Sequence, residues 1–164
     1  MSGRTKPPSI STLMLLRPYG VWFGVRKEVG IWSLAKIMEL QKNDICLLEF
    51  YPILVAFKMF GQEVRNKRVL IHTDNMGVKC IINNQTSKDP YIMVLLRDFV
   101  LTLLQLNVDF KAEYVSTKSN DLADPLSRQQ VHLFKSRAPD ADAQPTQIPK
   151  ELLPEHYDIT FKAY

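Results

Sequence analysis

Apolar side chains recur at helical spacing twice in the first half of the chain. In residues 46–61 they lie three or four positions apart, and the stretch finishes on Gly61, a residue type that often ends helices. Pro52 lies inside this predicted helix and indicates either a kink or a later helix start, because proline lacks the amide proton that an interior helical position donates. A shorter apolar stripe predicts a small second helix and consists of Val78, Ile81 and Ile82.

The clearest helical pattern covers residues 87–107. Asp89 stands where an N-cap residue is favoured, and Pro90 follows at the first helical position, where proline is well tolerated. The apolar residues that follow share one helical face: Ile92, Leu95, Leu96, Phe99, Leu103 and Leu106. This spacing predicts a long helix with one side in the core.

Other stretches show the patterns of β-strands. An apolar run in residues 68–74 ends on Asp74, and residues 108–115 alternate apolar and polar side chains, as a half-buried strand does. Residues 20–35 hold two β-rich runs around a polar centre and predict a hairpin. Residues 10–17 are either a further strand or only a lead to the first strand.

The predicted order is three strands, a helix, a strand, two helices, a strand and a short last helix at residues 119–128. Antiparallel strands followed by alternating helices and strands indicate an α/β fold, a mixed sheet with helices on its faces. We interpret residues 1–8 as a disordered lead and residues 9–128 as one domain. Residues 129–164 are rich in Pro, Ala, Asp, Gln and Lys and are interpreted as a largely irregular tail or linker, with a candidate docking segment at residues 149–164.

Composition changes this picture little. The 164 residues are 46% hydrophobic and 23% charged, as is usual for a soluble globular chain of one domain. Cys46 and Cys80 have no metal-type spacing and suggest no disulfide framework, which favours the cytoplasm or nucleus. We expect no membrane partner, because no stretch of about 18 apolar residues is evident. The net charge of +4 permits a polyanionic partner without requiring one.

Three carboxylates stand out by their surroundings. Glu49 shares a helical face with apolar residues, Asp74 ends an apolar strand, and Asp124 lies in the predicted last helix. If the fold brings them together, they could hold Mg²⁺-type ions, which prefer oxygen ligands and in pairs cleave phosphodiesters. The alternative for each is structural: Asp74 as a helix cap, Asp121 or Asp124 as the next cap, and Glu49 as a charge near a helix start.

A resemblance to a known family rests on three segments in the right order, "LEFYPI", "VLIHTDNMGVKCIINNQTSKDPYIMVLLR" and "NDLADPLSR". Together they resemble the ribonuclease H domain of retrotransposon polyproteins, most closely that of DIRS-type elements, where it follows a reverse transcriptase. The resemblance covers residues 18–128 and implies an RNase H-like mixed five-stranded sheet, with three antiparallel and then parallel strands and flanking helices. It also implies hydrolysis of the RNA strand of RNA–DNA hybrids by two Mg²⁺ or Mn²⁺ ions. By this resemblance Glu49, Asp74 and Asp124 match the catalytic metal ligands.

The chain departs from the family pattern in two places. The family opens its first strand with an aspartate that bridges both ions, but residues 10–24 contain no acid. If "WFGV" marks the middle of that strand, the expected aspartate falls near Arg17, and residues 10–16 are lead sequence. Pro125 directly follows Asp124, where the family often has a helix former. The missing aspartate predicts a large loss of rate or no catalysis, in a degenerate, domesticated or truncated copy.

Two classes of function follow. The first is a metal-dependent ribonuclease H, and the second is a non-catalytic RNase H-like module that binds nucleic acid or a protein; a transcribed remnant without function is a third hypothesis. His72 shares the strand face of Asp74 and is interpreted as a packed or surface histidine rather than as a site residue. The residues that either follow a phosphate backbone or form a solvated rim are Arg65, Lys67, Arg68, Asn75 and Lys79, with Lys88 and Lys111 further along.

Overall fold

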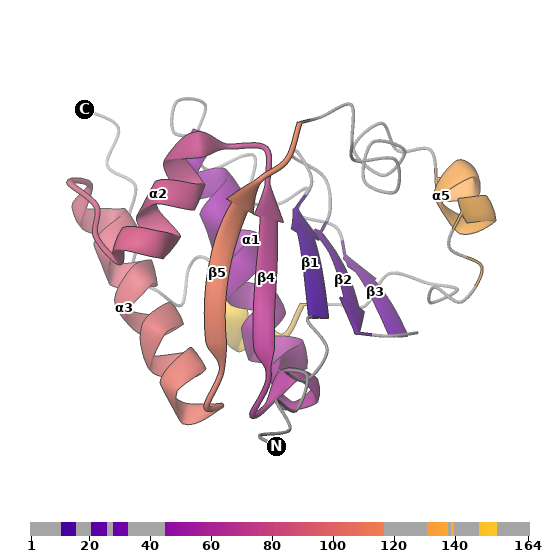
Figure 1. The fold of residues 1–164 in the computed structure, drawn as a ribbon, viewed down its shortest axis with the longest axis horizontal. Coiled ribbons are helices and arrows are strands. Elements are labelled where there is room, and N and C mark those ends of the chain that lie inside the picture. The colour runs from indigo at the N-terminus through magenta and orange to yellow at the C-terminus, as the bar shows by residue number, and fades with distance from the viewer. Residues whose placement is uncertain are drawn as a thin grey trace, which may run out of the picture.

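Three strands come first in the described chain, and helices and strands are mixed after them (Figure 1). The computed structural model describes residues 11–15, 21–25, 28–32, 45–116, 131–137, 139 and 148–153. Its elements are β1 (Ser11–Leu15), β2 (Val21–Val25), β3 (Glu28–Trp32), α1 (Ile45–Phe60), η2 (Gly61–Val64), β4 (Arg68–Thr73), α2 (Met76–Asn84), α3 (Pro90–Gln105), β5 (Asp109–Tyr114), α5 (Val131–Arg137) and η4 (Lys150–Leu152). The predicted order is therefore confirmed as far as β5. The last helix predicted at residues 119–128, with Asp121 and Asp124, lies outside the described residues.

The strands lie in one sheet in the order β3-β2-β1-β4-β5. β2 pairs antiparallel with both β1 and β3, and only residues 26–27 separate β2 from β3, so the predicted hairpin is confirmed. β1 and β5 both pair with β4 in parallel. Because parallel strands end at the same side of a sheet, the carboxyl ends of β1, β4 and β5 lie together. An α/β fold is thus confirmed.

Strand β1 decides between the two interpretations of the chain before residue 18. It lies between β2 and β4, with Thr12 opposite Leu70 and Met14 opposite His72. The interpretation of this stretch as a mere lead, with the first strand beginning after it, is therefore wrong. The residues of β1 are Ser, Thr, Leu, Met and Leu, so this strand contributes no carboxylate to the sheet.

Helix α1 is the core helix of the fold. It runs through Pro52, so the predicted later start is wrong, and its buried residues lie on all sides: Leu47, Phe50, Tyr51, Ile53, Leu54, Val55, Ala56 and Phe57. A helix that is apolar all round is one that the rest of the protein covers. By length and composition alone the segment Ile45–Val64 could cross a membrane, contrary to our expectation, but 65% of that window is buried inside the fold.

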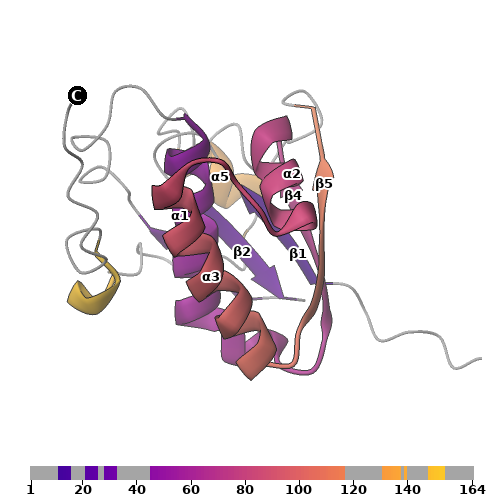
Figure 2. The ribbon, with the colours of Figure 1, turned by 90° about the vertical axis from the view of Figure 1, so that its left-hand side faces the viewer.

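Helix α3 packs beside α1 on the same face of the sheet (Figure 2). The Asp89 carboxylate caps it by accepting hydrogen bonds from the amides of Tyr91 (2.7 Å) and Ile92 (3.1 Å), and Pro90 is its first residue, as predicted. The predicted apolar face is buried throughout. Its central residue, Phe99, makes edge-to-face contacts with three other phenylalanines, Phe50, Phe57 and Phe110, at centroid distances of 5.4–5.6 Å.

The outer edge of the sheet is closed by a side chain of α2. β5 is an edge strand, and the Asn83 amide pairs with the backbone of Ala112 in both directions. Its Nδ2 donates to the Ala112 carbonyl oxygen (2.9 Å), and its Oδ1 accepts from the Ala112 amide (2.8 Å). Asn83 therefore makes the two hydrogen bonds that a neighbouring strand would make, which protects the edge against strand addition.

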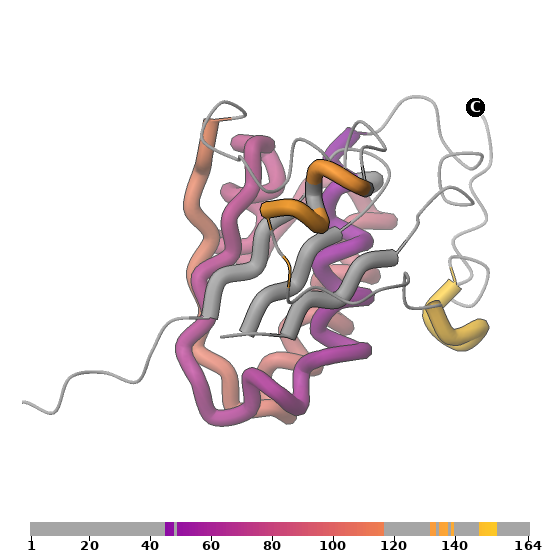
Figure 3. The backbone as a smooth tube through the Cα atoms, turned by 90° about the vertical axis from the view of Figure 1, so that its right-hand side faces the viewer, coloured from indigo at the N-terminus to yellow at the C-terminus, as the bar shows by residue number. Residues whose placement is uncertain are grey.

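The segment predicted to be an irregular tail contains two short regular elements, α5 and η4. In Figure 3, α5 (orange) lies towards the viewer. The η4 segment (yellow) lies to the right of α1. The first begins only three residues after the predicted last helix of the domain, so helical structure extends past residue 128. The second lies within the predicted docking segment.

Candidate metal and nucleic-acid site

The turn between β4 and α2 carries Asp74, the first of the predicted site residues. β4 ends at Thr73, and helix α2 is capped by Asn75, whose Oδ1 accepts hydrogen bonds from the amides of Gly77 (2.8 Å) and Val78 (3.2 Å). The structural alternative for Asp74, that it caps the following helix, is therefore wrong. Its half-buried carboxyl group stands at the carboxyl end of a central strand, where α/β sheets place ligands.

Glu49 belongs to the part of α1 that meets this turn. Cys46, one turn before Glu49 and on the same helical face, places its Sγ atom 3.8 Å from the Asn75 Oδ1 atom. The approach is close enough that a Cβ atom on Gly77 would lie 2.7 Å from this sulfur, so residue 77 must be small. Glu49 and Asp74 thus come from two elements that touch at the carboxyl end of β4.

Burial distinguishes Glu49 from the surface acids of the chain. The residue is only 6% exposed, and a carboxylate in such surroundings is costly unless it interacts with a cation or with hydrogen-bond donors. Glu49 is the fifth residue of α1, and the first turn of this helix contains no acidic residue, which argues against the alternative of a charge at the helix start.

The donor set among the described residues does not fit a two-ion centre. No group of three or more His, Cys, Asp or Glu side chains is close enough there to hold a metal ion. Glu49 and Asp74 are present, but β1, which runs beside β4 to the same end of the sheet, supplies no acid. Asp124, the third predicted ligand, lies outside the described residues. Two bridged divalent cations need more carboxylate oxygens than these two side chains offer.

His72 is the one titratable side chain of β4 near this end. The burial pattern of the strand places it on the face opposite to Val69, Ile71 and Thr73, and its backbone pairs in register with Glu113. His72 is half-buried, and its Nδ1 atom is buried and has no hydrogen-bond partner among the described residues. The interpretation of His72 as a packed or surface histidine rather than a site residue stays a prediction.

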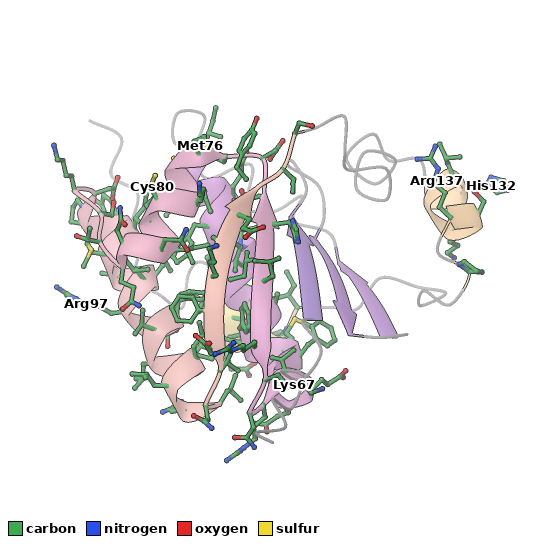
Figure 4. The ribbon with its side chains drawn as sticks, viewed as in Figure 1. Lys67, Met76, Cys80, Arg97, His132 and Arg137 are labelled. Carbon is green, nitrogen blue, oxygen red and sulfur yellow. The ribbon has the colours of Figure 1, made fainter. Side chains whose placement is uncertain are left out.

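The predicted basic residues separate into two groups. Arg65, Lys67 and Arg68 lie at the amino end of β4, whereas Lys79 lies on α2 close to Asp74. In Figure 4, Lys67 and Met76, the first residue of α2, mark opposite ends of the molecule. A strand of this length separates them by roughly 20 Å at 3.3 Å per residue.

The bases at the amino end already have partners. Lys67 Nζ donates to the Glu63 carbonyl oxygen at 2.6 Å, and Arg68 pairs with Asp109 at 2.9 Å. Beside them lies a cavity of ≈510 Å³ that is also lined by residues of the α3–β5 turn. Exposed pairs of this kind hold their charges weakly, so both cations stay available to a polyanion.

Comparison with solved structures identifies the architecture. The structure is similar to that of RNase H1 from the halophilic archaeon Halobacterium salinarum NRC-1, with a TM-score of 0.55 and 10% sequence identity over 76% of this chain and 98% of that chain. The chain has an RNase H-like fold. A second RNase H-like structure, the N-terminal RNase H domain of Rv2228c from Mycobacterium tuberculosis solved as a fusion with maltose-binding protein, aligns with a TM-score of 0.45 and 11% identity over 78% of this chain and 99% of that one. No protein-family model matches the sequence, and neither does any curated protein.

The two described acids lie on consecutive elements of this fold. In both the sequence and the structure, Glu49 lies on the helix that follows the antiparallel strands, and Asp74 follows the next strand. Sequence reasoning found both residues. It did not find Cys46 or Gly77, which set the distance between α1 and α2, because nothing in their spacing marks two residues 31 positions apart as neighbours.

Proposed function

We propose that this chain is an RNase H-like module that binds nucleic acid and has lost efficient cleavage. One observation carries the proposal: β1 runs parallel to β4 and ends beside it, yet contains no carboxylate. We further propose that the sheet is the complete five-stranded sheet of the RNase H domain of a DIRS-type retrotransposon. In the parent element, the domain would have followed a reverse transcriptase.

The expected loss of cleavage follows from electrostatics. In two-ion phosphodiester hydrolysis, a bridging carboxylate offsets the repulsion between two cations that lie about 4 Å apart. Without an acid on β1, Glu49 and Asp74 must hold any cation with Asp124 alone. We expect weak binding of a single Mg²⁺ or Mn²⁺ ion rather than a catalytic pair.

Nucleic-acid binding is supported by the distribution of positive charge. The chain has a net charge of +4 and an isoelectric point of about 9.1. Lys79 lies beside the acidic end, and Lys67 and Arg68 lie at the other end of β4, so a duplex lying along the strand would meet cations at both ends. Phosphate contacts of this kind release counterions and make the affinity strongly dependent on salt. The partner we propose is the RNA–DNA hybrid.

A second candidate function is a metal-dependent ribonuclease. Its specific support is the position of Glu49, a carboxylate that is only 6% exposed on the helix that meets the turn after β4, because buried carboxylates in such places are often functional. In that case Glu49, Asp74 and Asp124 would be the metal ligands, and two Mg²⁺ or Mn²⁺ ions would supply the activated water and stabilise the leaving oxygen.

Binding and cleavage of one substrate separate the two functions. The full chain is titrated into a fluorescent RNA–DNA hybrid at several salt concentrations, and the same hybrid is incubated with Mg²⁺ or Mn²⁺ to detect cleavage. Glu49→Gln and Asp74→Asn remove the charge of each predicted ligand. Glu63→Gln, the same change at an exposed glutamate, is the matched control.

We expect salt-dependent binding of the hybrid and no cleavage by any of these proteins. Cleavage by the wild type and the control that both ligand substitutions abolish would establish the ribonuclease instead. Absence of binding at low salt would contradict both functions.

A further inference from the structure

The chain returns to its own core helix near the C-terminus. Residues 148–153, which include η4, lie on the side of α1 that faces away from the sheet (Figures 2 and 3). About one hundred residues of sequence separate these two segments, so the contact is tertiary and not a local turn.

Two apolar anchors and one hydrogen bond hold the segment. Ile148 and Leu152 pack against the buried core, and the Tyr51 hydroxyl donates to the Leu152 carbonyl oxygen. Tyr51, whose hydroxyl reaches this segment, is only 3% exposed. Pro149, Lys150 and Glu151, between the anchors, are exposed.

Two backbone hydrogen bonds form within the segment itself. The Leu152 amide donates to the Pro149 carbonyl oxygen (3.0 Å), and the Leu153 amide donates to that of Lys150 (3.1 Å). A short turn that closes its own hydrogen bonds can dock through a few side chains without a strand or helix partner. Short peptide ligands also bind folded domains through a few side chains and backbone hydrogen bonds.

We propose that the face of α1 around Tyr51 is a peptide-docking surface and that residues 148–153 are its ligand, bound within the same chain. The recognised chemistry is an Ile-Pro-x-x-Leu turn, in which Ile and Leu fill apolar contacts and the Leu carbonyl oxygen accepts from a tyrosine hydroxyl. This surface is distinct from the proposed nucleic-acid site. Tyr51 lies about 200° around the helix from Glu49, at 100° per residue, so a ligand bound at Tyr51 does not lie on the face of Glu49.

The proposal is tested by cleaving the chain between the domain and residues 148–153 after the protein has folded. A specific protease site replaces residues 141–146 of the full chain, and a fluorophore is attached at the C-terminus. After cleavage, fluorescence anisotropy reports whether the C-terminal fragment stays on the domain. We expect it to remain bound at micromolar concentration, to dissociate on dilution, and to be displaced by an excess of unlabelled peptide spanning residues 145–156.

Three variants locate the binding energy. Leu152→Ala removes an anchor and should weaken retention at least ten-fold, and Tyr51→Phe keeps the ring but removes the hydrogen bond and should weaken it about five-fold. Glu151→Ala, on the same turn but exposed, is the matched control and should stay within two-fold of the wild type.

Immediate release of the wild-type fragment at tens of micromolar, or equal retention of the Leu152→Ala fragment, would overturn the proposal. Hybrid binding is measured before and after the fragment is diluted away, and we expect it to be unchanged. Loss of hybrid binding together with the fragment would contradict the independence of the two surfaces. A chain that never binds the hybrid would contradict only the proposed function, since retention of the fragment is a separate readout.

Discussion

The core around Phe99 and the carboxyl end of β4 differ in how many of the expected side chains are present. Around Phe99, α1, α3 and β5 each supply a phenylalanine or a buried aliphatic side chain, and the predicted apolar face has no gap. At the carboxyl end of β4, Asp74 follows the strand and Glu49 lies on the helix that meets this turn, whereas β1 contains no acid. Packing and chemistry thus depend on different residues, so the fold does not by itself determine whether the site is active.

The largest effect should come from the core. Phe99→Ala removes a ring that is fully buried and in edge-to-face contact with three others, and we expect the free energy of unfolding to fall by about 3–5 kcal/mol. Denaturant titration followed by circular dichroism measures this loss. Val94→Ala, on the exposed side of the same helix, should change the stability by no more than about 0.5 kcal/mol. Similar losses for both would mean that the core is not centred on Phe99.

The next effect concerns the sheet edge. Asn83→Ala leaves both the amide and the carbonyl group of Ala112 without their partner, and we expect a loss of about 1–3 kcal/mol together with self-association, seen as a concentration-dependent mass. Asn84→Ala, the adjacent exposed position of α2, should have neither effect. If the two variants behave alike, Asn83 does not protect the edge.

The third prediction concerns cleavage of the hybrid after an acid is added at the carboxyl end of β1. Leu15→Asp places a carboxylate at the end of β1, next to the end of β4, and we expect Mn²⁺-dependent cleavage of the hybrid at least ten-fold above the background of the assay, whereas the wild type stays at background. Thr12→Asp adds the same group near the other end of β1 and should give no cleavage. Circular dichroism confirms that both variants fold. Absence of cleavage by both folded variants would show that an acid at the end of β1 is not sufficient for cleavage.

The smallest expected effect is on the affinity for the hybrid, and it compares cations at the two ends of β4. Lys79→Ala, beside Asp74, should lower the affinity for the hybrid a few-fold and reduce the slope of log K against log salt by about 0.9, the value for one phosphate contact. Arg68→Ala removes a cation that is already paired with Asp109 and should have the weaker effect on affinity. A stronger effect of Arg68→Ala would shift the proposed duplex towards the amino end of the strand.

Periodicity was sufficient for most of the architecture. The face of α3 from Ile92 to Leu106, the Asp89 cap and the antiparallel hairpin were predicted from local pattern and confirmed, because helix capping and amphipathicity depend on neighbours within a few residues. Pro52 misled the prediction for α1, since packing on all sides stabilises a helix that proline alone would weaken. The stretch before residue 18 stayed ambiguous because a short apolar run has no helical or strand signature of its own.

The sequence alone was enough to single out Glu49 and Asp74. It also showed that residues 10–24 contain no acid. Three other features needed the folded molecule: the contact of Cys46 with the turn after β4, the closure of the edge by Asn83, and the docking of residues 148–153 on Tyr51. Each joins residues about 30 to 100 positions apart, and no local pattern encodes such a pairing. Long-range contacts follow from how the helices pack on the sheet, which short-range propensities do not specify.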